Sequence, residues 1–184
     1  MDQEINKRVC PVERAGALDI GLRKLVHNPK KILKTYLSEG MTALDIGCGP
    51  GFFTIEMAKL VGSSGEIVGA DLQDGMLEKV RSKIKNTILQ DTIALHKCQA
   101  DKIGTTKKFD FILVFYMLHE VPDPLLFLKE VKTLLNPDGK VLIAEPKFHV
   151  SQNDFTIAKD LMKKIGFDII DEPKIFFSRS VILK

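Results

Sequence analysis

Short apolar runs alternate with segments of helical periodicity from residue 41 to the end of the chain. The apolar runs read as strands at 42–46, 66–71, 92–98, 109–116 and 140–146, and helical stripes occupy the segments between most of them. A crossover between parallel strands is right-handed and covers an apolar face of the sheet. The alternation therefore predicts an α/β fold: a Rossmann-like, doubly wound, mostly parallel sheet with helices on both faces.

The end of the chain departs from this alternation. Residues 167–184 hold two β-rich runs joined by a short Glu-Pro-Lys connection, which predicts a hairpin. The hairpin brings the sheet to seven strands and adds an antiparallel strand.

Helix signals lie at several expected boundaries. Asp123 and Ser151 are placed as N-caps, Pro124 as a first helical residue, and Gly166 as a helix stop. Two further boundaries are expected from the apolar pattern: a helix over 51–62, and a helix stop at the Asn-Pro-Asp-Gly run of residues 136–139.

The length fits one domain of 184 residues. A helix that begins with Asn28 and Pro29 leads into the first strand, so residues 29–184 form the predicted domain and residues 1–28 the predicted arm or lid. Residues 1–34 carry eight basic side chains against four acids. Such a basic end could hold nucleic acid, but a solvated face is the more usual reading of scattered charges.

The composition predicts a cytoplasmic chain that does not enter a membrane. No apolar run approaches the ~20 residues of a membrane-spanning helix, and the first twenty residues show no secretory signal. Cys10, Cys48 and Cys98 are an odd number without CxxC spacing, so reduced thiols are expected, with neither disulfides nor a metal site.

A glycine-rich loop, Ala-Leu-Asp-Ile-Gly-Cys-Gly-Pro-Gly-Phe-Phe-Thr at 43–54, follows the first strand. In doubly wound sheets, ligands bind at the carboxyl ends of the strands. A P-loop would need Lys and Ser or Thr after the last glycine, where Phe52 and Phe53 stand. The dinucleotide spacing would need its third glycine at Phe52. Both ATP or GTP and NAD are therefore disfavoured.

Two acids define the ligand that remains. Asp45 can take a cationic amine, and the N–H groups that open the next helix can meet a carboxylate. Asp71 ends the second strand, where an acid can accept both ribose hydroxyls. A ligand with an amino-acid end and a nucleoside end is S-adenosylmethionine.

At these motifs the chain resembles the class I S-adenosylmethionine-dependent methyltransferases, over about residues 30–184. The resemblance is carried by Leu-Asp-Ile-Gly-Cys-Gly-Pro-Gly at 44–51, by residues 68–77 and 98–103, and by 109–123 followed by 134–146, which resemble the quinone and small-molecule subgroup. The family normally has an acid where Gln99 stands, so Gln99 or Asp101 would read the adenine. The resemblance implies the following cofactor-binding residues: Asp45, Gly47, Cys48, Gly49, Gly51, Asp71, Leu72, Gln99, Ala100, Asp101 and Phe115.

The resemblance also implies an in-line transfer of the sulfonium methyl group to an acceptor. A base is needed only if the acceptor arrives protonated, and His119 and His149 are the candidates. The Asn/Asp-Pro-Pro-Tyr motif of amide-nitrogen and nucleic-acid methyltransferases is missing near Phe115–Leu118, and no domain-sized insertion follows the fifth strand. A small-molecule acceptor is expected.

Three alternatives stay open. The chain could bind the cofactor without turnover, or methylate RNA with the help of its basic arm. Cys10 with Cys98 could hold a thiophilic acceptor such as arsenite. The sequence leaves the acceptor atom and the oligomeric state undetermined.

Overall fold

The strands of the central sheet are rich in buried branched and aromatic side chains, which pack well on a pleated surface. The computed structural model describes residues 27–184, so the predicted arm over 1–28 lies outside the described residues except for His27 and Asn28. The strands are β1 (Thr42–Ile46), β2 (Glu66–Asp71), β3 (Ile93–Lys97), β4 (Phe109–Phe115), β5 (Leu135–Pro146), β6 (Ile169–Asp171) and β7 (Ser178–Leu183).

Helices connect these strands. They are α4 (Pro29–Leu33), α5 (Thr54–Val61), α6 (Asp74–Ile84), the 3-10 turn η2 (Leu118–Glu120), α7 (Pro124–Thr133) and α8 (Gln152–Lys164). None of the helices within residues 27–184 combines the length and the apolar character needed to cross a membrane.

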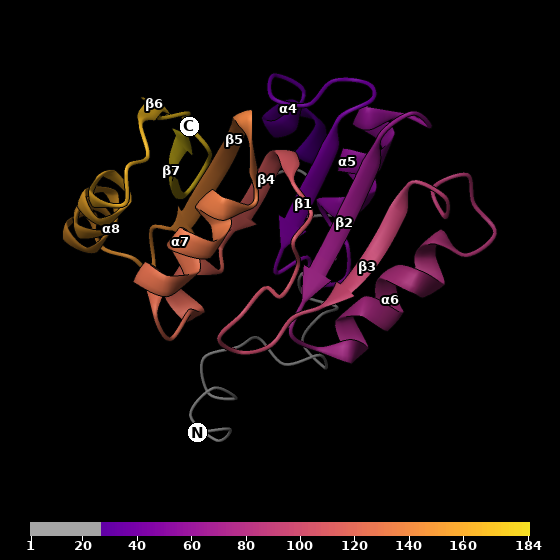
Figure 1. Cartoon of the computed structure of the whole chain (residues 1–184), viewed down its shortest axis with the longest axis horizontal. Coiled ribbons are helices and arrows are strands. Elements are labelled where there is room, and N and C mark those ends of the chain that lie inside the picture. Colours follow the sequence, from indigo (N-terminus) through magenta and orange to yellow (C-terminus); the bar gives the residue numbers. More distant parts are fainter. Residues whose placement is uncertain (1–26) are drawn as a thin grey trace.

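The seven strands form one sheet in the order β3-β2-β1-β4-β5-β7-β6 (Figure 1). Strands β1 to β5 pair in parallel, whereas β7 pairs antiparallel with both β5 and β6. The chain winds outward from β1 to β3, then returns to place β4 on the other side of β1. The predicted doubly wound sheet with a C-terminal antiparallel hairpin is confirmed, and its switch point lies between β1 and β4.

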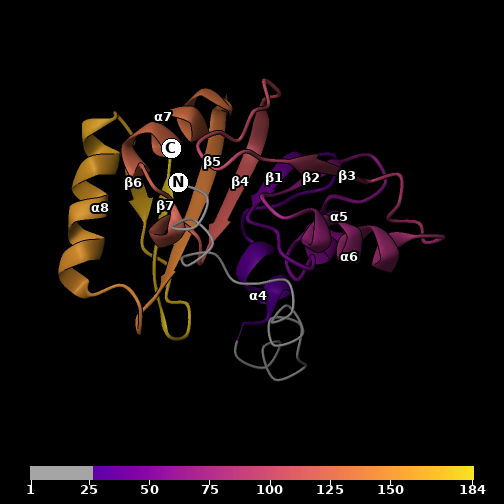
Figure 2. The same ribbon diagram turned by 90° about the horizontal axis from the view of Figure 1, so that it is seen from below.

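Helices cover both faces of the sheet (Figure 2). Apolar side chains of α4, α5 and α6 pack on one face, in a core that includes Leu33, Met57 and Val80. Apolar side chains of α7 and α8 pack on the other face, in a core that includes Leu128 and Met162. Because side chains alternate along a strand, each central strand contributes to both cores.

The predicted caps are confirmed at three helices. Asn28 Oδ1 accepts a hydrogen bond from Lys31 N, and Asp123 Oδ1 accepts one from Leu126 N, each at 3.0 Å. Ser151 opens α8 with a capping box, in which its hydroxyl and the Asp154 side chain each accept from the other's backbone N–H.

Three predicted boundaries are wrong. Helix α5 begins at Thr54 rather than at Gly51, whose φ of +85° lies outside the helical region. Helix α7 ends at Thr133, and residues 136–139 belong to β5 instead of stopping the helix. In this segment Asn136 Nδ2 donates a hydrogen bond to Asp110 Oδ1 of β4 at 2.6 Å. Contacts with β4 therefore extend β5 toward its N-terminal end. The hairpin connection is longer than predicted, because β6 ends at Asp171 and β7 begins at Ser178.

Candidate functional site

A cavity of about 450 Å³ lies at the carboxyl ends of the parallel strands. Its walls come from the segments that follow β1, β2, β3, β4 and β5, together with the start of α7. The site therefore occupies the switch point between β1 and β4, where an open α/β sheet leaves a crevice. All eleven predicted cofactor residues except Gly51 line this cavity, as do His119 and His149.

The glycine loop supplies the backbone of the cavity wall next to β1. Gly47, Gly49 and Gly51 have φ values of +71°, +52° and +85°, a conformation that other residues rarely adopt. A Cβ on Gly47 would stand 3.2 Å from the Met117 side chain, whereas a Cβ on Gly49 would meet no protein atom within 4 Å. Gly49 thus leaves the space beside the loop open to a ligand, and Gly51 shapes the turn beneath it.

Asp45 lies at the base of the cavity and is 2% exposed. Its Oδ2 accepts a hydrogen bond of 2.6 Å from the hydroxyl of Thr54, the first residue of α5. A buried carboxylate needs such donors, because desolvation of an ionised oxygen is costly. The hydrogen bond fixes one oxygen of Asp45 against the start of the helix.

Asp71, the second predicted acid, is the last residue of β2 and contacts the glycine loop. Its Oδ2 accepts from Gly49 N at 2.9 Å and its Oδ1 from Gln73 N at 2.8 Å, so this acid also ties the loop to β2. Burial raises the pKa of Asp71, and the two N–H donors partly offset that effect. Each carboxylate oxygen can accept a second hydrogen bond, and the residue lines the cavity.

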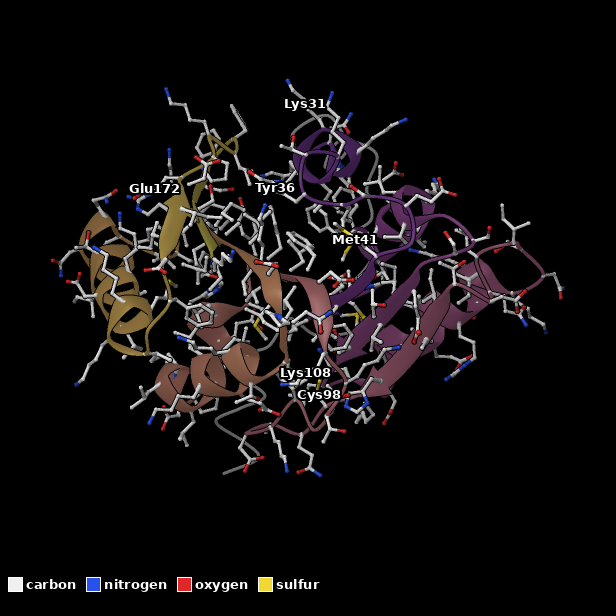
Figure 3. All side chains as sticks on the ribbon, turned by 45° about the horizontal axis from the view of Figure 1, so that its top comes forward. Lys31, Tyr36, Met41, Cys98, Lys108 and Glu172 are labelled. Atoms are coloured by element: carbon white, nitrogen blue, oxygen red, sulfur yellow. The ribbon has the colours of Figure 1, made fainter. Side chains whose placement is uncertain are left out.

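The segment after β3 forms the far wall. Cys98, labelled in Figure 3, immediately follows the strand, and Gln99, Ala100 and Asp101 line the cavity after it. Gln99 and Lys102 close a turn through backbone hydrogen bonds of 2.9 and 3.4 Å. Both side chains that could read an adenine, Gln99 and Asp101, are exposed at this wall.

Aromatic rings form the wall near β4. The Phe115 ring lies 4.4 Å from the Phe53 ring and 4.5 Å from the Tyr116 ring, measured between centroids. Tyr116 has a φ of +61°, and its hydroxyl lies 2.6 Å from Ser178 Oγ and 3.1 Å from His27 Nε2. The strained backbone of Tyr116 is therefore held by side chains from two other parts of the chain.

A cluster of ionisable groups lies at the carboxyl ends of β4 and β5. His119 Nδ1 is 2.6 Å from Glu145 Oε2, and the ring of His149 is 5.4 Å from that of His119. Burial disfavours the imidazolium of His119, but the hydrogen bond and charge of Glu145 outweigh it and raise the His119 pKa. Burial raises the pKa of the neighbouring Glu120 to about 7. Glu120 can therefore exchange a proton with a ligand near neutral pH.

The two cysteines of the described region are poor nucleophiles. Cys48 and Cys98 are buried free thiols. Burial raises the pKa of both thiols, that of Cys98 to about 12. Within residues 27–184 no cluster of His, Cys, Asp or Glu could hold a metal ion. Cys10, the predicted partner in a thiophilic site, lies outside the described residues.

Sequence reasoning missed two side chains that shape the site. Thr54 reaches Asp45 from nine residues away, and a threonine at the start of a helix carries no signal of that contact. His27 is 6% exposed and bonds both Tyr116 and the Phe176 carbonyl, which is 149 residues away in sequence. Only the folded sheet brings these groups together.

Comparisons with known proteins show the family and the fold of the chain. The family model described as a methyltransferase domain matches residues 37–173. Among curated proteins, the chain is 40% identical over 113 residues to a demethylmenaquinone methyltransferase of Lactobacillus johnsonii, which is 61% of this chain and 46% of that protein. It is 35% identical over 109 residues to the Bacillus subtilis protein of the same name, covering 59% and 47%. The chain spans about half the length of these relatives.

Solved structures share the fold. A SAM-dependent methyltransferase from Aquifex aeolicus superposes with a TM-score of 0.84 at 24% identity, covering 95% of this chain and 98% of that one. Aeropyrum pernix fibrillarin, solved with natively bound S-adenosylmethionine, superposes with a TM-score of 0.67 at 13% identity, covering 88% and 74%. Given the family match over residues 37–173, the chain belongs to the methyltransferase-domain family of class I S-adenosylmethionine-dependent methyltransferases.

Proposed function

We propose that the chain transfers the methyl group of S-adenosylmethionine to a small-molecule acceptor. The observation that carries this proposal is the cavity at the switch point, because it joins the glycine loop, Asp45 and Asp71 to a wall of aromatic and histidine side chains. Its volume of about 450 Å³ lies in the usual range for small-molecule sites. A cofactor bound along the loop would therefore point its reactive end toward a second ligand in the same cavity.

We assign the cofactor to the cavity in three parts. The amino-acid end would lie between Asp45 and the glycine loop, where a carboxylate can take its ammonium group. The ribose would lie at Asp71, whose two oxygens retain acceptor capacity. The adenine would lie beside Leu72 and residues 99–101.

The acceptor would occupy the remaining part of the cavity, near the carboxyl ends of β4 and β5. That part is lined mainly by apolar side chains: Tyr116, Met117, Val121, Leu126, Phe127 and Phe148. The relatives named as demethylmenaquinone methyltransferases support an aromatic acceptor of the quinone type. An apolar wall suits such a ring, because aromatic surface gains free energy on leaving water.

Catalysis would consist largely of positioning. The sulfonium is already activated, and alignment of acceptor, methyl carbon and sulfur can contribute ~7–11 kcal/mol. An arm or lid over residues 1–28 stays a prediction from the sequence, because residues 1–26 lie outside the described part of the chain.

Calorimetric titration with S-adenosylmethionine tests the cofactor assignment. The Asp71→Ala variant loses the carboxylate proposed for the ribose, so its binding free energy should fall by about 2–4 kcal/mol. Asp160→Ala, which removes an exposed acid of α8, is the matched control and should bind like the wild type. NAD titrated in parallel should give no binding. Wild-type affinity in Asp71→Ala would refute the assignment of Asp71.

Release of S-adenosylhomocysteine then tests turnover. A hydroquinone, arsenite and RNA should be compared as acceptors, with only the hydroquinone giving product. Cofactor binding with no turnover of any acceptor would favour a regulatory binding protein. RNA binding that weakens steeply with salt would favour an RNA methyltransferase. A cytoplasmic location stays a prediction from the sequence.

A further inference from the structure

Glu145, the penultimate residue of β5, is a buried carboxyl with three hydrogen-bond donors. It is 2% exposed. Its Oε1 accepts from Leu118 N at 3.1 Å, and its Oε2 accepts from His119 N at 3.2 Å and from His119 Nδ1 at 2.6 Å. The strand thus holds both the backbone of η2 and the imidazole of His119 through one side chain.

This arrangement fixes the orientation and the tautomer of His119. A carboxylate only accepts hydrogen bonds, so Nδ1 must carry the proton of the neutral ring. The lone pair of the neutral ring then lies on Nε2, for which the described residues provide no hydrogen-bond partner. The His119 side chain is 23% exposed and lines the cavity. Nε2 is therefore available to a ligand in that cavity.

We propose that His119 Nε2 is the general base of the transfer, that Glu145 is its positioning residue, and that the acceptor is a hydroxylated aromatic compound whose oxygen arrives protonated. This inference rests on the proposed function. In the step, the acceptor O–H bond breaks and its proton moves to Nε2. The electron pair on oxygen forms the bond to the methyl carbon, the carbon–sulfur bond breaks, and its pair returns to sulfur as neutral S-adenosylhomocysteine. The imidazolium that forms lies against the Glu145 carboxylate.

The groups around His119 set the direction of the pH dependence. Glu145 and Glu120 together outweigh burial and raise the pKa of His119. His149 approaches from the segment after β5, Asp71 acts on Glu120 from β2, and Arg179 stands opposite Glu145 in the β5–β7 ladder. A base is active only when unprotonated, so the rate should rise with pH and level off above the raised pKa of His119.

Nitrogen NMR of the full chain tests the dyad without any acceptor. Long-range proton–nitrogen spectra assign the tautomer of each of the four histidines. The signals of His119 are identified because they are missing from the spectrum of His119→Gln. We expect a proton on Nδ1 of neutral His119. In Glu145→Gln the carboxylate charge is gone, so the His119 pKa should fall. A proton on Nε2 instead, or an unchanged His119 pKa in Glu145→Gln, would overturn the proposal even if S-adenosylmethionine binds normally.

Kinetics separate a base from a purely structural histidine. With 1,4-dihydroxynaphthalene as the probe acceptor, His119→Ala should lower kcat by about 10²–10⁴-fold, and added imidazole should restore part of the rate. Glu145→Gln should shift the rising limb of kcat to lower pH. The profiles are measured in Glu120→Gln as well, because Glu120 titrates near the same pH.

The outcomes test separately the base role of His119, the positioning role of Glu145 and the proposed function. Lowered stability of Glu145→Gln with an unshifted pH profile would mean that Glu145 only anchors η2, which refutes the positioning role. Turnover of the probe by His119→Ala at the wild-type rate would refute the base. No S-adenosylmethionine binding by the wild type would instead refute the proposed function, and the NMR result would still decide the tautomer.

Discussion

Asp45 and Asp71 show how two buried acids at neighbouring strand ends acquire different surroundings. Asp45 accepts from a side-chain hydroxyl, that of Thr54, whereas Asp71 accepts from the backbone N–H groups of Gly49 and Gln73. Backbone donors depend only on the loop conformation, but the hydrogen bond from Thr54 to Asp45 depends on one side chain. The geometry of Asp45 should therefore be sensitive to a single substitution outside the glycine motif.

Thr54→Val should lower the free energy of unfolding by about 1–3 kcal/mol, because it keeps the shape of a side chain with 0% exposure but removes the donor to a buried carboxylate. Urea denaturation measures the change, and calorimetry should show weaker S-adenosylmethionine binding in the same variant. Thr54→Ser retains the hydroxyl and serves as the matched control for binding. Equal cofactor affinity in the valine and serine variants would show that this hydrogen bond does not organise Asp45.

The sequence predicted which residues stand at strand ends, but not the partners that hold them. Asp45 was identified from its place before the glycine loop, Asp71 from its place at the end of a strand and His119 from its place after one, and the fold places all three at one cavity. The contact of His119 with Glu145 spans 26 residues and depends on the pairing of β4 with β5. Local sequence patterns carry no information about contacts between residues so far apart in the sequence. The partners of these residues therefore became visible only in the structure.

Among the helices and strands, boundaries set by local chemistry were predicted correctly and boundaries set by tertiary pairing were not. Ser151 and Asp123 cap their helices through contacts within four residues, which a sequence pattern can describe. The start of β5 depends instead on a tertiary contact with Asp110 of β4. The predicted helix stop at 136–139 was wrong because pairing with β4 makes these residues part of β5.

The capping box of α8 gives the prediction at this scale. Ser151→Ala should lower the free energy of unfolding by about 1 kcal/mol, because the N–H of Asp154 loses its acceptor. Chemical denaturation measures the loss. Ser151→Asn, which restores a good N-cap, should recover most of it. Because α8 contributes no residue to the cavity lining, S-adenosylmethionine affinity should stay at the wild-type value in both variants. If Ser151→Ala lowered both the free energy of unfolding and the affinity for S-adenosylmethionine, α8 would influence the site, contrary to this prediction.

Across the whole molecule, two cores share one sheet, so neither face can unfold without exposing the other. Ile67 of β2 belongs to the core under α5 and α6, and Ile143 of β5 belongs to the core under α7 and α8. Both side chains are fully buried. Strands β1 and β4 lie between them in the sheet, which separates the two sites by roughly 14 Å at about 4.8 Å per strand.

Ile67→Val and Ile143→Val should each lower the free energy of unfolding by about 0.5–1.5 kcal/mol, because each removes one buried methylene. If the sheet couples the two cores into one cooperative unit, fluorescence and circular dichroism should report a single coincident urea transition for each variant. The double variant should then lose the sum of the two changes to within about 0.5 kcal/mol, since the sites share no contacts. Two separate transitions, with only one moved by each substitution, would show instead that the faces unfold independently, and the switch-point cavity would then lie between two units rather than inside one.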